Sequence, residues 1–332
     1  MFNKEVKKIL CIIIIASLIS ISLGIWILSN DLQNTRCYHH NNVSNENYVP
    51  KTPSLDDYLT FANLGNSTIQ DFFYYIFLKN ENSSEYVLMI YYDHNKNSFS
   101  FNSYVDIKEF KNAGTNHQIR YMQSKVYKKD ASVIWESQDG FFKSIIFPSN
   151  ITTRIDIEIK NFDLNLIFKG KPFWYHHGTT AEIAPGKYVH GFEILGEVYG
   201  KVNDMNVQGY GVFERADFTR SLVEDNSTLF LNWIAVVSNE VKGIFYWQGT
   251  YKEAGIWIEN TYKEPIDFAF VNLSIDEDDV KYYHMLVSLN TGKIDISGES
   301  RVSGGHLSVV FTKIQYNGTE YEGFSFIDTT RF

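Results

Sequence analysis

Residues 154–160 read RIDIEIK, and this stretch decides the fold class of the chain. The isoleucines at positions 155, 157 and 159 alternate with charged residues, so a β-strand places all of them on one face. The pattern predicts a half-buried strand with one apolar face and one solvated face. Residues 162–168 are expected to form its hairpin partner.

The same period of two recurs along the rest of the chain. Residues 187–202 alternate, and Asn203-Asp204 predicts a tight turn into residues 205–215. Further strands are expected at 72–79 with 85–93, 231–238 with 243–251, 256–260 with 266–274, and at 282–289 and 306–315. Ser54-Leu55-Asp56-Asp57 has the form of a capping box and predicts one short helix. Many short strands without a long helical period favour an all-β chain built of barrels or sandwiches.

The composition favours strands and excludes one class of partner. Aromatic residues make up 16% of the 332 residues, and such side chains pack well on a pleated sheet. The formal net charge is −9, and a strongly acidic chain repels nucleic acid, so no nucleic-acid partner is expected. Cys11 and Cys37 both lie near the N-terminus, so the body has no disulfide framework. The oligomeric state stays open.

Residues 9–28 read ILCIIIIASLISISLGIWIL and carry no charge. At about 1.5 Å per residue, this helix would span roughly 30 Å, the thickness of a bilayer core. The lysines of residues 1–8 precede it, so we expect a single-pass signal-anchor with a cytoplasmic N-terminus and an extracytoplasmic main domain. Membrane lipid is then a partner and the cell membrane the location. A cleaved signal peptide, with small residues at Ser22 and Gly24, is the alternative.

A polar, Asn-rich stretch over residues 29–55 predicts a stalk. Two β domains are expected after it, at 56–220 and 221–332. Seven Asn-x-Ser/Thr sequons mark candidate glycosylation sites of an exported glycoprotein: Asn42, Asn66, Asn82, Asn150, Asn226, Asn272 and Asn317.

Common catalytic signatures are missing from the sequence. It contains no Gly-rich phosphate loop, no H-E-x-x-H, no paired CxxC and no G-x-S-x-G elbow. These gaps argue against nucleotide enzymes, zinc proteases and serine hydrolases of common type. We therefore expect no cofactor and no metal.

The unusual run Phe173-Trp174-Tyr175-His176-His177-Gly178 contains adjacent histidines, which point to opposite faces of a strand. One of them, together with an inward-facing His190, makes a candidate proton-transfer pair, because imidazole titrates near neutrality. The alternative is an ordinary set of hydrogen-bonded histidines.

Glu214 and Asp71 are the candidate acids. Glu214 shares a strand face with Gln208 and Tyr210, and a cavity on that side would raise its pKa and suit it to protonating an alkene. On a solvated face it would be a surface charge. Asp71 is either a cap at the start of a strand or a buried acid.

The order of these motifs resembles the carotenoid 1,2-hydratase/AttH-like family over most of residues 56–332. The matching stretches are Asp71-Phe72-Phe73-Tyr74, residues 171–202, Gly209-Tyr210-Gly211-Val212-Phe213-Glu214-Arg215, and Asn232-Trp233-Ile234 with Asn239-Glu240. The chain departs from the family where Phe72 and Phe73 replace a tryptophan pair and where Glu214-Arg215-Ala216-Asp217 replaces Asp-His-x-Trp. The resemblance implies two lipocalin-like antiparallel β-barrel domains around a cavity for a hydrophobic small molecule.

Three functions remain open at this point. The first is binding of a hydrophobic, isoprenoid or lipid-like molecule, for which the candidate ligand-binding residues are Tyr74, Trp174, Tyr175, His176, His177, Tyr188, Tyr210 and Trp233. The second is a hydratase, cyclase or isomerase of isoprenoids or polyenes that uses Glu214, Asp71 or His190 for acid–base chemistry. The third is a surface glycoprotein with a structural or adhesive role and no internal site.

Overall fold

The structure is a computed structural model and describes residues 48–64, 68–105, 117–120, 123–159, 162–219, 232–248, 251–275, 281–304 and 307–328. The predicted anchor at 9–28 and most of the predicted stalk lie outside these residues. Within the described ranges, no helix is both long enough and apolar enough to cross a membrane.

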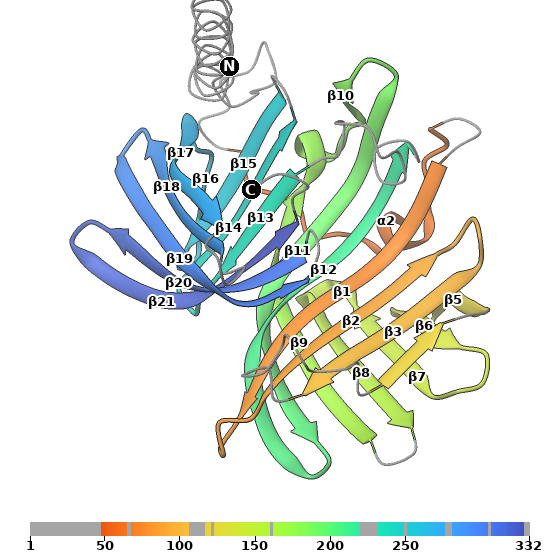
Figure 1. Cartoon of the computed structure of the whole chain (residues 1–332). Helices are drawn as coiled ribbons and strands as arrows, with labels where there is room; N and C mark the ends of the chain where they lie inside the picture. Colours follow the sequence, from red (N-terminus) through yellow and green to blue (C-terminus); the bar gives the residue numbers. More distant parts are fainter. Residues whose placement is uncertain are drawn as a thin grey trace, which may run out of the picture.

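The described chain is all-β, as the alternation predicts, and forms two curled antiparallel sheets (Figure 1). The first sheet has the order β4-β3-β2-β1-β12-β11-β9-β8-β7-β6-β5, and β10 pairs with β11. Its strands are β1 (Thr68–Asn80), β2 (Glu85–Asp93), β3 (Ser98–Val105), β4 (His117–Arg120), β5 (Ser124–Lys129), β6 (Ser132–Ser137), β7 (Phe142–Phe147), β8 (Thr152–Ile159), β9 (Phe162–Trp174), β10 (Ala181–Ala184), β11 (Lys187–Val202) and β12 (Met205–Thr219).

The second sheet has the order β16-β15-β14-β13-β21-β20-β19-β18-β17. Its strands are β13 (Asn232–Val237), β14 (Val241–Gln248), β15 (Tyr251–Ile258), β16 (Thr261–Lys263), β17 (Asp267–Ile275), β18 (Lys281–Leu289), β19 (Gly292–Gly304), β20 (Leu307–Tyr316) and β21 (Thr319–Asp328). Three short helical segments complete the described elements: α2 (Leu55–Leu59), η2 (Pro148–Asn150) and η3 (Tyr175–Gly178).

Most predicted hairpins are confirmed. The stretch 154–160 falls in β8, which pairs with β9 and buries Ile155 and Ile157. The turn at Asn203-Asp204 joins β11 to β12, and both of its residues have positive φ, as a tight hairpin turn needs. The predicted capping box at Ser54 is also present, with reciprocal bonds between Ser54 and Asp57.

One predicted hairpin, 256–260 with 266–274, is wrong. β15 instead turns back at Glu259, whose φ is 56°, and pairs with the short β16, while β17 pairs with β18. The tight turn at Glu259 comes too early for β17 to be the partner.

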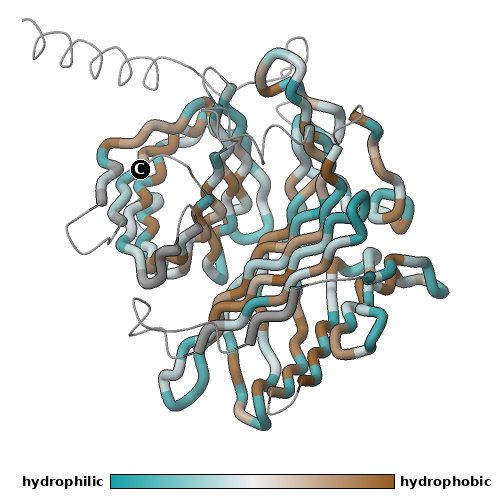
Figure 2. The backbone as a smooth tube through the Cα atoms, turned by 45° about the vertical axis from the view of Figure 1, so that its right-hand side comes forward, coloured by the Kyte–Doolittle hydropathy of each residue, from teal (hydrophilic) through white to brown (hydrophobic). Residues whose placement is uncertain are grey.

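Apolar side chains form three buried clusters, and alternate residues of one strand serve different clusters. Hydrophobic and hydrophilic positions alternate along many of the strands (Figure 2). In β1, Phe72 and Tyr74 pack inside the first sheet, whereas Tyr75 and Phe77 pack against the second sheet. A third cluster fills the second sheet. The two sheets therefore share a buried interface, and β1, β11 and β12 are covered on both faces there.

The interior of the first sheet is packed with aromatic and aliphatic side chains. Tyr58 of α2 is fully buried against Phe192 and Phe213, and the Trp135 ring stacks on Tyr74. Where β9 passes β11, a Cβ on Gly196 would lie 2.1 Å from the carbonyl oxygen of Lys169, so only glycine fits.

Candidate active site between the two sheets

Three carboxyl groups project from neighbouring strands of the first sheet into the interface with the second sheet. They are Asp71 on β1, Glu193 on β11 and Glu214 on β12, and Glu193 pairs directly with Glu214 across the strands. Their residues are 6%, 0% and 7% exposed. Two ionised carboxylates facing each other in such a place would repel strongly, so this cluster must bind protons.

The Tyr175 hydroxyl joins two of these carboxyls. Its oxygen lies 2.8 Å from Glu193 Oε1 and 3.0 Å from Glu214 Oε2. A phenol has only one proton to donate, so it can donate to one carboxylate and must accept from the other. At least one of the two glutamates is therefore protonated when both bonds form.

The pKa of each acid in the cluster is raised, first of all by burial. The pKa values of Asp71 and Glu193 lie well above their usual range, because desolvation is reinforced by the charge of Glu214. The pKa of Glu214 is also raised by burial, but hydrogen bonds from Glu193, Tyr175 and Asp71 oppose the rise. Burial thus favours the protonated form of all three acids, and hydrogen bonds favour the ionised form most at Glu214.

Tyr246 on β14 brings the second sheet to this cluster. Its ring centroid lies 4.6 Å from that of Tyr175, and it opposes part of the rise in the pKa of Glu193. In the described part of the chain, Glu193 Oε2 and Tyr246 Oη are buried without a hydrogen-bond partner of normal geometry. Such unsatisfied polar atoms are rare in folded proteins and often mark a site of chemistry.

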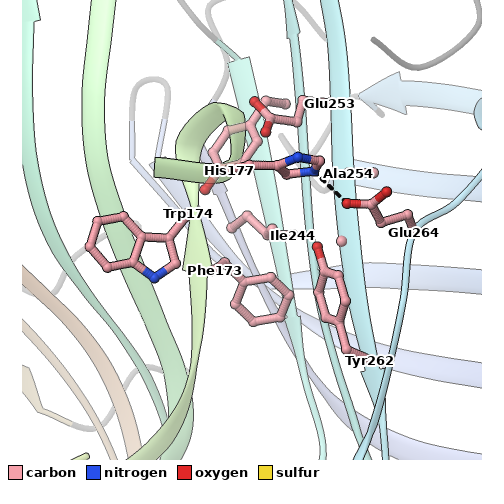
Figure 3. A pocket seen from close by; sticks show the side chains of 10 residues that line it. Phe173, Trp174, His177, Ile244, Glu253, Ala254, Tyr262 and Glu264 are labelled. Atoms are coloured by element: carbon pink, nitrogen blue, oxygen red, sulfur yellow. Dashed lines mark hydrogen bonds and ion pairs between the residues drawn. The ribbon is translucent and has the colours of Figure 1, made fainter. Parts of the chain in front are cut away.

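Tyr246 also lines a small pocket, whose other side chains are shown in Figure 3. Its apolar walls are Phe173, Trp174, Ile244 and Tyr262, and its titratable groups are His177, Glu253 and Glu264. The enclosed volume is about 10 Å³, which is room for about one water molecule. The pocket therefore brings three titratable side chains together beside aromatic and aliphatic ones.

Glu253 on β15 is the acid of this pocket. Its Oε1 accepts a 2.6 Å bond from the backbone N–H of His176, and its Oε2 accepts a bond from the Tyr251 hydroxyl. Burial raises the pKa of Glu253 from 4.5 to about 7, and these two hydrogen bonds and His177 limit the rise. A carboxyl with this pKa can both give and take a proton near neutral pH.

The His177 ring points across the pocket to Glu264 (Figure 3), with 2.5 Å between Nε2 and Oε1. Hydrogen bonding and the charge of Glu264 raise the pKa of His177 against the effect of burial. The two side chains are 29% and 22% exposed, so this pair connects the pocket with solvent. Tyr48 covers the histidine, with the ring centroids 3.9 Å apart.

The histidines lie on a turn, so the expectation that they belong to a strand is wrong. His176 and His177 have φ values of 46° and 56°, in the left-handed region that non-glycine residues avoid. Each such residue costs on the order of 1 kcal/mol or more. The bond from His176 to Glu253 and the His177–Glu264 pair hold the turn, so contacts with the second sheet set its shape.

Of the predicted site residues, Asp71, Glu214 and Tyr175 come together in the carboxyl cluster. Trp174 and His177 lie in the adjacent pocket. His190 lines a different cavity and is not paired with His177. The remaining predicted ligand-binding residues lie elsewhere. Tyr74 is buried inside the first sheet, Trp233 packs in the interface cluster, Tyr188 is half-buried beside Glu182, and the Tyr210 hydroxyl bonds Asn239.

Four of the predicted sequons fall on described residues. Asn82, Asn150, Asn272 and Asn317 are all exposed, so a glycan could be attached at each of them. Asn42, Asn66 and Asn226 lie outside the described residues.

Sequence reasoning missed Glu193, Tyr246, Glu253, Tyr262 and Glu264. The alternation of residues 187–202 shows that the strand has two faces, but it does not show that a second sheet covers the face that carries Glu193. Residues 251–258 read YKEAGIWI, so Glu253 stands beside Lys252 and before an apolar stretch. This pattern does not show that the glutamate is buried.

No family model matches the sequence. A search of curated proteins also finds no match. Among solved structures, the chain is similar to a candidate AttH protein from Nitrosomonas europaea, with 11% identity and a TM-score of 0.49, covering 84% of this chain and 98% of that one. It is similar to kievitone hydratase from Nectria haematococca (12% identity, TM-score 0.47, 84% and 96% covered).

A third similar structure is CghA with Sch210972, with 9% identity and a TM-score of 0.43, covering 78% of this chain and 87% of that one. The first of these three similar structures bears the name AttH, which is also the name of the family that the order of motifs resembles.

Proposed function

We propose that this protein is an enzyme that transfers protons to and from a hydrophobic small molecule in the space between its two sheets. The observation that supports it best is Glu253, a buried carboxyl with a pKa of about 7, in a pocket that it shares with aromatic side chains and with His177 and Glu264. Strongly perturbed acids gather at functional sites because catalysis needs a pKa near the working pH.

The proposed chemistry is protonation of an alkene. The proton of the Glu253 carboxylic acid adds to one alkene carbon and leaves a carbocation on its neighbour. A water molecule then adds its oxygen to the cation and gives its proton to a carboxylate, so that the net change is addition of water. If the carbocation instead loses a proton to the carboxylate and no water adds, the reaction is an isomerisation or a cyclisation.

The surrounding groups would return the enzyme to its starting state. The partly exposed His177–Glu264 pair can exchange protons with solvent and pass them to the pocket. On the inner side, Tyr246 lies between Glu253 and the Asp71–Glu193–Glu214 cluster, and its pKa is raised by Glu193 and Glu253 in addition to burial. The cluster is a reservoir of protons in a dry environment.

The walls of the pocket select an apolar substrate, and the resemblance to carotenoid hydratases implies an isoprenoid or polyene. The present volume admits about one water molecule, so substrate access requires side chains to move. The Tyr48 ring, stacked on His177 and edge-on to Tyr262, is the side chain whose displacement opens the pocket.

Solvent isotope incorporation tests the proposal without knowledge of the product. The full-length chain is incubated in D2O with a panel of isoprenoid alkenes and polyenes, and mass spectrometry follows deuterium bound to carbon. Hydration, isomerisation and cyclisation by this route all add one solvent deuteron. We expect incorporation by the natural chain and by Glu322→Gln, an exposed control on β21, and its loss in Glu253→Gln. Equal incorporation by all three proteins would contradict the role of Glu253.

Carriage of a hydrophobic ligand is the second candidate, favoured by the aromatic walls Phe173, Trp174 and Tyr262. In that case an apolar ligand co-purifies with the chain, and no substrate in the panel takes up deuterium. The buried acids would then serve only to hold the ligand.

We further propose that each sheet is a lipocalin-like domain and that residues 9–28 anchor the chain in the cell membrane with the sheets outside the cytoplasm. Three lysines against one glutamate before the apolar stretch, and four exposed sequons, support this topology. Protease protection in intact cells tests it: cleavage of the sheets from outside is expected, and full protection would overturn it.

A further inference from the structure

A second cavity lies where α2 meets the first sheet. Its volume is about 240 Å³, smaller than a typical drug-sized pocket. Two aromatic rings, Trp174 and Phe192, form part of its wall, and Asp56 and Asp57 of α2 stand opposite with their carboxylates. The cavity thus combines ring faces with negative charge.

The one guanidinium that lines the cavity is fully engaged. Arg215 donates to Asp217 Oδ1 and to the backbone oxygens of Tyr58 and Thr60, and it lies 4.1 Å from the Phe61 ring centroid. It is 1% exposed. Arg215 therefore holds the chain around α2, and the charge of Asp217 offsets its own.

An ammonium group already sits at the edge of the cavity. Lys51 Nζ lies 3.1 Å from Asp57 Oδ1 and 4.3 Å from the Trp174 ring centroid. Its side chain is 61% exposed, and exposed ion pairs and cation–π contacts are weak. An external cation can therefore displace it. The cavity and its edge carry three carboxylates and two cations, so one negative charge remains in excess. The carboxylates are Asp56, Asp57 and Asp217, and the cations are Lys51 and Arg215.

We propose that this cavity binds a small organic cation, an ammonium group on a compact apolar body. The ammonium takes the position of Lys51 Nζ between Asp57 and the Trp174 ring, and the apolar part rests against Phe192. His190 also lines this cavity. This site is separate from the proposed proton-transfer pocket, although Trp174 lines both.

Choline is a suitable probe, because its trimethylammonium group carries a hydroxyl on a short chain. Its neutral isostere 3,3-dimethylbutan-1-ol has the same shape without the charge. The full-length chain, kept in a non-ionic detergent because of residues 9–28, is titrated with each by calorimetry and by NMR of the Trp174 indole N–H. We expect choline to bind with a dissociation constant on the order of 1 mM and the alcohol to bind at least tenfold more weakly. Equal binding of the two overturns the proposal.

Two variants at exposed positions test the geometry without disturbing the core. Lys51→Met removes the internal competitor and should tighten choline binding by about twofold to fivefold. Asp56→Asn removes the excess charge and should weaken binding by a similar factor. The matched control is Asp204→Asn, on the turn at the far end of β11 and β12, which should leave binding unchanged. If Lys51→Met leaves the affinity unchanged or weakens it, the proposed ammonium position is wrong.

Discussion

Replacing Glu253 by glutamine should change how the stability of the protein depends on pH. The folded-state pKa of Glu253 is about 7, against an ordinary value of 4.5. Below the ordinary value, both the folded and the unfolded state are protonated, and the stability that this proton contributes is fully present. As the pH rises from there to about 7, the unfolded state loses the proton first, so the free energy of unfolding falls.

The size of this fall follows from the two pKa values. One pKa unit corresponds to about 1.36 kcal/mol, so Glu253 alone removes about 3 kcal/mol of stability by the time the pH passes 7. The residue is buried, so the solvent screening that reduces such values at the surface is small here. Glutamine cannot titrate. It also loses one of the two hydrogen bonds to Tyr251 and His176, and this loss costs the same free energy at every pH.

The assay is urea unfolding followed by tryptophan fluorescence between about pH 5 and about pH 8. The difference in free energy of unfolding between Glu253→Gln and the natural chain should shift by about 2.5 kcal/mol in favour of the variant across this range, whatever the absolute stability of the variant. Glu322→Gln, an exposed substitution of the same kind, should run parallel to the natural chain. Parallel curves for Glu253→Gln would refute the claim that Glu253 is buried with a raised pKa.

Three other substitutions test the packing around the site by urea unfolding. Glu193→Gln should cost less than about 1 kcal/mol at neutral pH, because glutamine replaces a protonated acid of the same shape; a much larger loss would mean that Glu193 is ionised. Tyr175→Phe should cost about 1–3 kcal/mol, because it removes the hydroxyl between Glu193 and Glu214, and a neutral result would exclude that bridge. Gly196→Ala should cost about 3 kcal/mol, because its Cβ would meet the Lys169 carbonyl, and unchanged stability would show that β9 and β11 do not approach so closely.

The sequence predicts strands well where one face of a strand meets water. β8 shows this, since Ile155 and Ile157 are buried and Arg154 is exposed, as the period of two requires. In β1, residues 72–78 read FFYYIFL and are nearly all buried, so the two faces of the strand cannot be told apart there. Which face meets which layer depends on the second sheet, and no local pattern contains that information.

The candidate site shows the same limit. Glu214 and Asp71 could be singled out as acids beside aromatic residues, and the structure buries both. Glu193 reaches the site through strand pairing, and Glu253 reaches it through the packing of the second sheet on the first. The two glutamates are 60 positions apart in the chain. Such contacts cannot be read from spacing. The left-handed turn at His176 and His177 is likewise set by bonds to the second sheet, so sequence reasoning placed it in a strand.

Infrared spectroscopy of the carboxylic acid carbonyl band tests the central claim most directly, because it detects protonated acids without any substrate. At about pH 7, the natural chain should retain a band from buried acids, and Glu193→Gln and Asp71→Asn should each weaken it. The exposed Glu322→Gln should leave the band unchanged. Absence of the band from the natural chain at about pH 7 would mean that the acids between the sheets are ionised, and the account of the site would be contradicted.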